Sequence, residues 1–378
     1  MPRYLTVDDV EVEGIDVLVR SDLNVPLEDG AITDDFRIRA ALPTLETLVD
    51  AGAHVTVCSH LGRPEGADPA FSLRPVAEHL ATLTSKEVGF ETGGQITVLE
   101  NTRFEPGETE NDPAYAARLA EGHGLFVQDA FGSVHRAHSS TVGVAELVKS
   151  VAGPLLDKEL TALNRFVEDP VIPYVVVLGG AKVSDKLGVI ENLLPKVDAM
   201  LIGGGMCFTL LKAKGIEVGK SLVEEDMVES VKPLLEGLEG AKMILPTDVI
   251  VADRFAEDAE HRQVYSKDIP ADWVGLDIGK ETQILFASVI RTAETVFWNG
   301  PMGVFEWEPF RAGTQAMARA LVATSAFTAV GGGDSVAAVR QLGLDDGISH
   351  ISTGGGAGLE LLEGRILPGV QVLERWAP

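Results

Sequence analysis

The sequence is poor in cysteine, with two among 378 residues. Cys58 and Cys207 lie far apart and form neither a CxxC pair nor a spacing typical of metal ligands. A disulfide-stapled extracellular scaffold is therefore excluded, and so is a cysteine-based zinc site. We predict that both thiols are buried near strands of a protein in the reducing cytoplasm.

Long apolar runs are also missing. No stretch approaches the roughly 20 apolar residues that a membrane-spanning helix needs. The first nine residues, MPRYLTVDD, are too acidic and too weakly apolar for a signal peptide. The sequence therefore predicts a cytoplasmic protein that does not bind membranes.

Positive charge is scarce relative to negative charge. The chain has 57 acidic and 31 basic residues and a formal net charge of −26, and only 13 of the bases are lysines. A nucleic-acid partner is therefore not expected. The excess acid has two interpretations, simple solubility or adaptation to a salty cytoplasm, where screening shortens the Debye length to roughly 3 Å at 1 M salt. We favour the second as a hypothesis.

Apolar runs of strand length alternate with amphipathic stretches along the whole chain. The predicted strands are residues 17–19, 55–58, 96–99, 125–127, 175–178, 199–202, 242–245, 295–298, 327–330 and 350–352. The predicted helices are residues 37–51, 74–84, 113–121, 186–194, 224–235, 284–292 and 313–324. This alternation is typical of α/β folds with parallel sheets.

The length of the chain favours two domains over one. A helical pattern runs through residues 154–170, between a Gly-Pro and an Asp-Pro step. We therefore predict two doubly wound, Rossmann-like parallel-sheet domains joined by a helix. A single large sheet is the alternative, and ten strands make it less attractive.

Ligands of open α/β sheets bind beyond the carboxyl ends of the strands. In the first half, each strand is followed there by arginine, histidine or short polar residues. These sets are Arg20, Asp22 and Asn24; His60 and Arg63; Arg103; and His135, Arg136 and His138. Any single arginine is more often a surface ion pair. Several together suit carboxylate and phosphate, which accept bidentate bonds. Of the histidines, His135 is the one expected to be merely structural.

Glycine turns follow the strands of the second half, at Gly179, Gly203, Gly300, Gly331 and Gly354. Glycines let a phosphorylated ligand approach the backbone closely. If a helix begins at the first of these turns, Lys182 and Lys186 lie on one face of it, at spacing i, i+4. An ordinary strand–turn–helix with two solvated lysines is equally compatible with that segment alone.

In the same half, Asp334 and Ser335 lie where a further helix would begin. Ser335 is predicted to cap that helix, whose N-terminus attracts phosphate, and Asp334 is a candidate ligand for Mg²⁺.

Two sequence motifs resemble known nucleotide-binding motifs but do not match them. Residues 215–221 resemble a P-loop but are one residue short and follow no strand, and no glycine set completes GxGxxG. An arginine-rich anion site and a glycine-rich nucleotide site together indicate phosphoryl transfer.

Eight ordered motifs then resemble those of the phosphoglycerate kinase family. They are RSDLNVP from Arg20, SHLGRP from Ser59, ENTRF from Glu100, DAFGSVHRAHSS from Asp129, GGAKVSDK from Gly179, WNGPMGVFE from Trp298, GGGDS from Gly331 and STGGGA from Ser352. They span nearly the whole chain. One small departure is Gln128, where the family usually has asparagine.

The resemblance implies reversible, Mg²⁺-dependent transfer of a phosphoryl group from 1,3-bisphosphoglycerate to ADP, giving 3-phosphoglycerate and ATP. Arg37 and Lys182 would be catalytic. The phosphoglycerate site would comprise Asp22, Asn24, Arg37, His60, Arg63, Arg103 and Arg136. The nucleotide site would comprise Gly180, Lys186, Gly203, Gly204, Asn299, Glu306, Gly331, Gly332, Gly333, Asp334 and Ser335, with Asp334 on the metal. Gly354 and Gly355 would offer a helix N-terminus to an anion.

The family also implies a monomer whose C-terminal tail returns to the first domain. The expected domains are residues 1–153 with 365–378 for phosphoglycerate, 154–170 as the connecting helix, and 171–364 for the nucleotide. The short chain and surplus acid resemble a salt-adapted archaeal member.

Two other functions were weighed. A non-catalytic binding protein would require that some catalytic residues be missing, whereas the lysines, arginines and Asp334 are all present. A nicotinamide-dependent dehydrogenase fails on the missing fingerprint.

Overall fold

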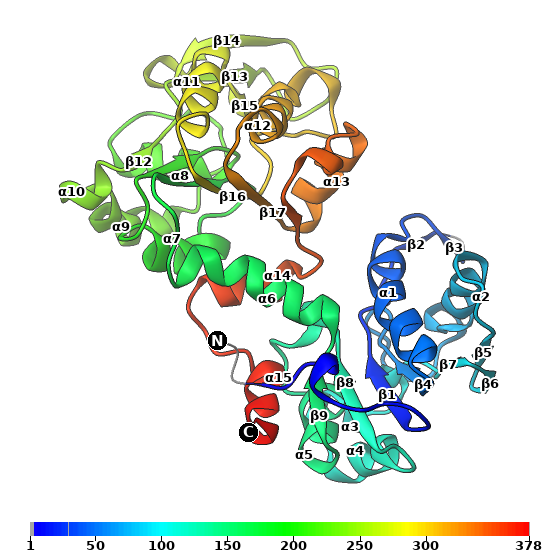
Figure 1. Cartoon of the computed structure of the whole chain (residues 1–378). Helices are drawn as coiled ribbons and strands as arrows, with labels where there is room; N and C mark the ends of the chain where they lie inside the picture. Colours follow the sequence, from blue (N-terminus) through cyan, green and yellow to red (C-terminus); the bar gives the residue numbers. More distant parts are fainter. Residues whose placement is uncertain (1–3, 29, 378) are drawn as a thin grey trace. The chain divides into compact units, whose positions relative to one another are not determined.

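The computed structural model describes residues 4–28 and 30–377. The outermost residues of the expected first domain, 1–3 and 378, lie outside that part of the chain. Contacts divide the protein into two compact units, Met1–Thr161 with Ile366–Pro378 and Ala162–Arg365. Figure 1 shows that each unit is built around its own twisted sheet. The two large sheets are separate, so the single-sheet alternative is wrong.

A seven-stranded sheet forms the centre of the first unit, in the order β6-β5-β7-β4-β1-β8-β9. Its strands are β1 (Asp16–Arg20), β4 (His54–Cys58), β5 (Val88–Phe90), β6 (Thr92–Gly94), β7 (Ile96–Val98), β8 (Leu125–Gln128) and β9 (Ser150–Ala152). All neighbours are parallel except β5 and β6. The chain runs outward from β1 on one side and then returns to β8 on its other side. In open α/β sheets, ligands bind at the carboxyl ends of the strands where the order reverses in this way, here β1 and β8.

Helices cover this sheet because its central strands are apolar on both faces. They are α1 (Phe36–Asp50), α2 (Arg74–Leu83), α3 (Gly107–Glu110), α4 (Pro113–Ala120) and α5 (Val144–Leu147), with a π-helical turn at Ser139–Gly143. A small hairpin, β2 (Leu27–Glu28) and β3 (Ala31–Ile32), precedes α1. Val17, Val19 and Val57 are fully buried under α1 and α2. The strands therefore hold their carboxyl ends rigidly at one edge.

The second unit has a six-stranded parallel sheet, in the order β12-β11-β10-β16-β17-β18. Its strands are β10 (Tyr174–Leu178), β11 (Ala199–Ile202), β12 (Met243–Ile244), β16 (Thr295–Asn299), β17 (Phe327–Gly331) and β18 (His350–Ile351). β10 pairs with both β11 and β16, so the direction of winding reverses between β10 and β16. All ten strands predicted from the sequence are present, which confirms the α/β fold with two parallel sheets.

A three-stranded antiparallel sheet, which the sequence analysis missed, lies between β12 and β16 in the chain. It consists of β13 (Asp248–Ala252), β14 (His261–Tyr265) and β15 (Val274–Ile278). β14 is almost entirely exposed, and β13 and β15 each contain a buried aspartate, Asp248 or Asp277. β14 shows no apolar pattern, whereas β13 has an apolar run at residues 249–252 and β15 alternates apolar residues with Gly275 and Asp277.

The helices of the second unit follow its strands. They are α7 (Leu187–Leu193), α8 (Met206–Ala213), α9 (Val228–Val231), α10 (Gly237–Gly240), α11 (Lys280–Ile290), α12 (Ala312–Ala323), α13 (Gly333–Gln341) and α14 (Gly355–Leu362). The helix predicted over residues 224–235 is wrong as a single element. It breaks into 3₁₀ turns on either side of α9, and Pro233, which lacks an N–H, lies in the second turn.

Helix α6 (Pro154–Val167) contributes residues to both units. Its N-terminal N–H groups at Leu155 and Leu156 donate to the Asp129 carboxyl, at 2.9 and 3.1 Å. Its other end places Phe166 against Phe297 and Phe327 of the second unit, with ring centroids 5.5 and 5.8 Å apart. The helix is therefore capped by one unit and packed into the core of the other.

The C-terminal segment completes the first unit. It contains α15 (Pro368–Gln371) and a 3₁₀ turn at Val372–Trp376. Figure 1 shows this red segment beside β8 and β9. Within residues 4–28 and 30–377, no helix is both long and apolar enough to cross a bilayer.

Candidate active site

Five arginines gather at the carboxyl edge of the first sheet. They are Arg20, Arg37, Arg63, Arg103 and Arg136. They come from different segments, because parallel strands end at a common edge and each delivers its following loop there. The charges lie close enough to influence one another. Burial and the neighbouring Arg136 and Arg20 lower the pKa of Arg103 to about 10.

Arg20 is the buried member of the cluster, with 1% of its surface exposed. Its Nε donates to Ser140 Oγ at 2.8 Å, and its Nη2 donates to His60 Nδ1 at 3.1 Å. His60 is itself buried, and burial together with the Arg20 and Arg103 charges holds its pKa well below the usual range. His60 is therefore a neutral imidazole in a strongly positive environment.

Arg37 is held at the edge of the cluster by the loop after β1. Its Nη1 lies 3.3 Å from the Asp22 carboxylate and donates to the Asn24 carbonyl at 2.9 Å. The Asn24 side-chain oxygen accepts from the Gly62 N–H at 2.8 Å. Asp22 and Asn24 therefore hold one nitrogen of the Arg37 guanidinium, and Asn24 ties this loop to the one after β4. The Arg37 side chain remains 30% exposed and available to a ligand.

The loop after β7 orients Arg103. Asn101 is buried and bonds both the N–H and the carbonyl of Leu61, at 3.2 and 2.8 Å, and also accepts from the Arg103 N–H. The Arg103 guanidinium donates to the Gly62 carbonyl. Asn101 thus locks two strand-end loops together, and Arg103 projects from that rigid support.

Arg63 and Arg136 are exposed and complete the outer side of the cluster. Arg136 donates to His135 at 3.1 Å. His138 is mostly buried, and burial lowers its pKa to about 4 although Glu108 acts in the opposite direction. The cluster therefore combines guanidinium forks with neutral imidazoles. This arrangement recognises a small ligand that carries carboxylate or phosphate groups.

In the second unit, glycine turns meet where the winding reverses between β10 and β16. Gly180 and Gly300 have φ values of +99° and +94°. The Gly180 N–H donates to the Pro301 carbonyl at 2.9 Å, and a Cβ on Gly204 would lie 2.5 Å from Gly180 N. Only glycine permits backbones to pack this closely. The carboxyl edge of this sheet therefore presents backbone instead of side chains.

Two cavities open at this edge. The polar cavity, about 370 Å³, is lined by Lys182, Lys186, Asn299, Asp334 and Ser335 among glycine turns that include Gly180, Gly332, Gly333 and Gly355. Lys186 donates to the Asn299 side-chain oxygen, and burial lowers the Lys186 pKa against the raising effect of Asp185 and Asp334. Helices α13 and α14 begin at Gly333 and Gly355, so two helix N-termini border this cavity. Such a cavity suits a polyphosphate.

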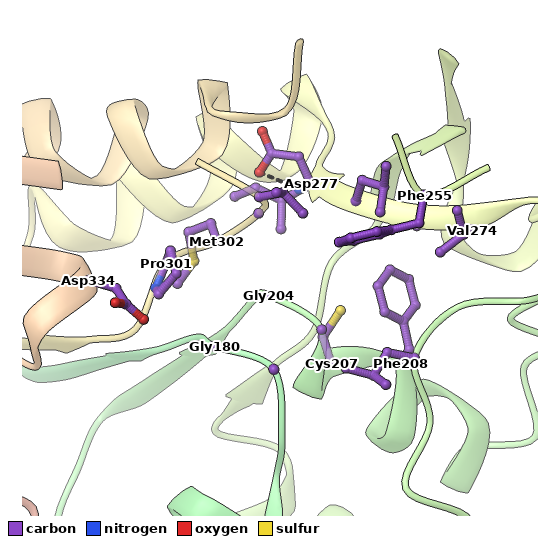
Figure 2. A pocket seen from close by; sticks show the side chains of 18 of the residues that line it. Gly180, Gly204, Cys207, Phe208, Phe255, Val274, Asp277, Pro301, Met302 and Asp334 are labelled. Carbon is purple, nitrogen blue, oxygen red and sulfur yellow. Dashed lines mark hydrogen bonds between the residues drawn. The ribbon is translucent and has the colours of Figure 1, made fainter. Parts of the chain in front are cut away.

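The second cavity, about 300 Å³, is mostly apolar. Figure 2 shows the rings of Phe208 and Phe255 at one end, with Met302 and Pro301 along the wall and Asp334 at the other end. Gly180 and Asp334 line both cavities, so the two are continuous around these residues. The pair can accept a flat apolar ring in one compartment and phosphates in the other.

A model of the phosphoglycerate kinase family matches residues 7–365 of the chain. The chain belongs to the phosphoglycerate kinase family. It is 56% identical to the phosphoglycerate kinase of Salinispora arenicola over 98% of this chain and 99% of the relative. The enzyme of Thermus thermophilus is 53% identical, again over 98% and 99%. As a member of this family the chain is a kinase, a phosphate-transferring enzyme.

Solved structures of phosphoglycerate kinases agree with this fold. The structure from Coxiella burnetii has a TM-score of 0.91 at 42% identity and covers 99% of this chain and 100% of its own. The archaeal structure from Pyrococcus horikoshii has a TM-score of 0.87 at 31% identity, covering 98% and 100%. The curated relatives named above are bacterial and share more identity than this archaeal structure.

Two local predictions for the kinase fold are wrong. The helix after β10 does not start at the glycine turn. Val183 is buried, and α7 begins only at Leu187, so Lys182 stands in a loop and the i, i+4 argument fails. Ser335 does not cap α13, because its hydroxyl accepts from the Gly300 N–H at 2.6 Å and the N-cap residue is Gly332. Ser335 therefore fixes the turn after β16.

Two predicted nucleotide residues, Gly203 and Gly331, and the predicted anion-binding residue Gly354 line neither cavity. A Cβ on Gly203 would lie 2.5 Å from Met302 Sδ, so Gly203 lies beneath the apolar wall. The predicted thiols are both buried; Cys58 ends β4, whereas Cys207 is in α8 and borders the apolar cavity.

Sequence reasoning missed Phe208 and Phe255 as wall residues of that cavity, and it missed Glu108 and Ser140 behind the arginine cluster. The only available signal for Phe255 was a large aromatic residue in an otherwise charged stretch. Ser140 belongs to a motif quoted above, but the motif does not reveal its partners.

Magnesium fits the donor set of the second unit. Asp334 is an exposed carboxylate that borders both cavities. Within the described residues no group of three or more His, Cys, Asp or Glu side chains is arranged to hold a metal. Mg²⁺ in kinases takes one or two protein carboxylates and otherwise binds substrate phosphates and water. A single carboxylate beside a polyphosphate cavity is consistent with that pattern.

Proposed function

We propose that the chain catalyses reversible, Mg²⁺-dependent transfer of a phosphoryl group from 1,3-bisphosphoglycerate to ADP, giving 3-phosphoglycerate and ATP. The observation that supports this most strongly is that the two units of this kinase carry different types of binding site. One unit carries a guanidinium cluster for a small anion. The other carries a pair of cavities shaped for a base and a polyphosphate.

The phosphoglycerate site is assigned to the arginine cluster, in a domain formed by residues 1–153 and 365–378. Its proposed ligands are Asp22, Asn24, Arg37, His60, Arg63, Arg103 and Arg136. Of these, Asp22 and Asn24 act by holding Arg37 and the adjoining loop, as their contacts with Arg37 and Gly62 indicate. The exposed guanidinium groups provide the direct contacts to carboxylate and phosphate.

The nucleotide site is assigned to residues 171–364, with 154–170 as the connecting helix. The apolar cavity would take the base, with Gly204 in its lining and Gly203 beneath its wall, and Glu306 would lie near the ribose. The polar cavity would take the phosphates on Lys186, Asn299, Ser335 and the turns at Gly180, Gly332 and Gly333. Gly331, the last residue of β17, would support the last of these turns without lining the cavity. The helix N-terminus at Gly354 and Gly355 offers further backbone donors to an anion.

Catalysis is proposed to consist of positioning and charge neutralisation, since phosphoryl transfer needs little covalent help from the protein. Arg37 and Lys182 would neutralise the charge that develops on the transferred group. Lys182 is exposed and borders the polar cavity, and among the described residues it makes no ion pair that would occupy it. Mg²⁺, held by Asp334 and the nucleotide phosphates, supplies further neutralisation when bound.

A coupled assay of ATP formation from 1,3-bisphosphoglycerate tests this function, run at low and high potassium chloride. Activity that requires added Mg²⁺ is expected. Absence of turnover under all conditions, by a protein that still binds nucleotide, would favour a non-catalytic binding protein.

We also propose that the protein is a cytoplasmic monomer, as its two isolated cysteines and its family suggest. The salt series tests a further proposal, that the protein is adapted to high salt. This rests on the net charge of −26 alone. It does not require an archaeal likeness, which had only chain length and charge in its favour. Full stability and activity without added salt would contradict it.

A further inference from the structure

A fully buried carboxylate lies behind the arginine cluster. Glu108, in the short helix α3, has no exposed surface, and the roles proposed above do not use it. Its Oε2 accepts from the Ser140 N–H at 3.0 Å, and its Oε1 accepts from the Ser140 hydroxyl at 2.6 Å. A buried charge is retained only when its bonds are satisfied, so these contacts define how Glu108 is held.

The Ser140 hydroxyl has its proton direction fixed by Glu108. A carboxylate can only accept, so the short contact requires the hydroxyl to donate to Glu108. The lone pairs of Ser140 Oγ are then directed elsewhere, and one accepts from Arg20 Nε at 2.8 Å. The hydroxyl therefore presents an acceptor to the buried guanidinium.

Held in this way, Arg20 reaches His60 with another of its nitrogens. A guanidinium has five donors and no acceptor, so His60 Nδ1, 3.1 Å from Arg20 Nη2, must be unprotonated. The ring proton of the neutral imidazole then resides on Nε2. Within the described part of the chain this Nε2 has no hydrogen-bond partner, and it is not sealed from solvent. The ring consequently offers one N–H to whatever binds beside it.

We propose that Glu108 and Ser140 are positioning residues that act through Arg20 to fix His60 as an Nε2–H donor of the anion site. The donor and acceptor roles along this chain of hydrogen bonds are fixed, because the Glu108 carboxylate can only accept and the Arg20 guanidinium can only donate. A neutral donor matters here. An anion receives a directed hydrogen bond from His60 without adding another cation to a cluster that already contains five. The identity of the anion as phosphoglycerate rests on the function proposed above.

A purely structural role for the same contacts would be to neutralise Arg20 and stabilise the fold. Ser140→Ala separates the two roles, since it removes the hydroxyl link and leaves every charge in place. Ser139→Ala is a matched control. Ser139 is an equally buried neighbour whose hydroxyl donates only to the backbone carbonyls of Gly107 and Asp112.

The direct test is ¹⁵N NMR of the full chain labelled at histidine. The unmodified protein and Ser139→Ala should show His60 as a single Nε2–H tautomer. Ser140→Ala should show exchange between the two tautomers. Arg20→Lys, which keeps the charge but cannot reproduce both contacts of the guanidinium, should do the same. An Nδ1–H tautomer in the unmodified protein, or an unchanged spectrum in both variants, would overturn the proposal.

Kinetics provide the second readout. Ser140→Ala should raise the KM for 3-phosphoglycerate about tenfold, the effect expected for one directed hydrogen bond to a charged group, with little change in kcat or in the KM for ATP. Ser139→Ala should leave all three values unchanged. Equal losses in both variants would indicate a general packing defect and contradict a positioning role. If the unmodified protein shows no kinase turnover, the proposed function fails, while the tautomer measurement still decides whether Glu108 and Ser140 position His60.

Discussion

The two candidate sites differ in what presents their hydrogen-bond donors. In the first unit, long side chains reach the ligand and are held by buried partners such as Asn101 and Glu108. In the second unit, the turns after β10 and β16 present backbone, and a Cβ on Gly204 or Gly300 would lie within 2.5 Å of a neighbouring backbone atom. We therefore expect the first site to be damaged by truncating its side chains, and the second by adding side-chain atoms to its glycines.

The difference also follows from the shapes of the ligands proposed for each unit. A small, highly charged acid offers few atoms, so guanidinium forks must surround it. A nucleotide offers a flat ring and a chain of phosphates, which an apolar slot and helix N-termini can accept with few charged side chains. The scarcity of lysine therefore has little consequence for the second site, where only Lys182 and Lys186 line the polar cavity among the described residues.

The largest expected effect comes from removing a catalytic cation. Arg37→Ala and Lys182→Ala should each lower kcat about 10³-fold, by analogy with the arginine fingers of other phosphotransferases, and raise KM far less. Steady-state assays in both directions measure this. Lys220→Ala is the control, because Lys220 is an exposed lysine that pairs with Asp272 on the surface. An unchanged kcat in Arg37→Ala would remove that residue from the catalytic step.

Adding one methyl group to the backbone-built site should have the next largest effect. Gly204→Ala places a Cβ 2.5 Å from Gly180 N and should raise the KM for ADP at least about tenfold, because overpacking costs about 1–3 kcal/mol. Binding of 3-phosphoglycerate should persist.

Gly215→Ala is the matched control for that change. Gly215 also has a positive φ, +82°, against +65° at Gly204, but a Cβ there meets no atom within 4 Å. It therefore reports backbone strain without crowding. Equal losses in the two variants would show that strain, and not close packing of the turns, limits the site.

A third change distinguishes the roles proposed for the two cavities. Phe255→Ala removes a ring that borders the apolar cavity and whose centroid lies 4.7 Å from that of the Trp307 ring. The affinity for ATP should fall about tenfold, while the affinity for inorganic triphosphate should not change. Isothermal titration calorimetry measures both. Tyr265→Ala, a half-exposed ring on β14 that lines neither cavity, should be silent. A parallel loss for triphosphate would contradict the assignment of separate compartments.

The smallest effect concerns pH and stability. Burial raises the pKa of Asp277, on the wall of the apolar cavity, to about 8. The folded chain therefore keeps a proton that the unfolded chain releases near pH 4. This group accordingly destabilises the fold progressively as pH rises from about 4 to about 8.

Asp277→Asn removes that dependence. Its thermal midpoint should fall less than that of the unmodified protein between pH 5 and pH 8. Asp272→Asn, at an exposed position, should follow the unmodified protein. Identical pH profiles for all three would show that Asp277 does not titrate in this range.

The parallel strands could be predicted because burial on both faces leaves a plain apolar run, as in residues 175–178. Of the antiparallel sheet only β14 could not be predicted, since it is exposed and has no apolar pattern; the apolar run of β13 and the alternation of β15 were overlooked. For the site, the strand-end rule identified the loops that carry Arg63 and Lys182, whereas Arg37, in α1, came only from the family resemblance. It could not identify their partners. Ser140 lies 120 residues from Arg20 and 32 from Glu108, and no local pattern encodes contacts at such separations.

The route of the chain through the two units has a consequence for its synthesis. The second unit is one continuous segment, Ala162–Arg365, whereas the first also needs Ile366–Pro378. That last segment is bonded into place by Gly369 N–H to the Val134 carbonyl and by Trp376 Nε1 to the Ala145 carbonyl, both at 2.8 Å. Domains fold as units as they leave the ribosome. The first unit, whose synthesis begins earlier, is thus completed only after the whole second unit has been synthesised, since Gly369 and Trp376 follow Arg365 in the chain.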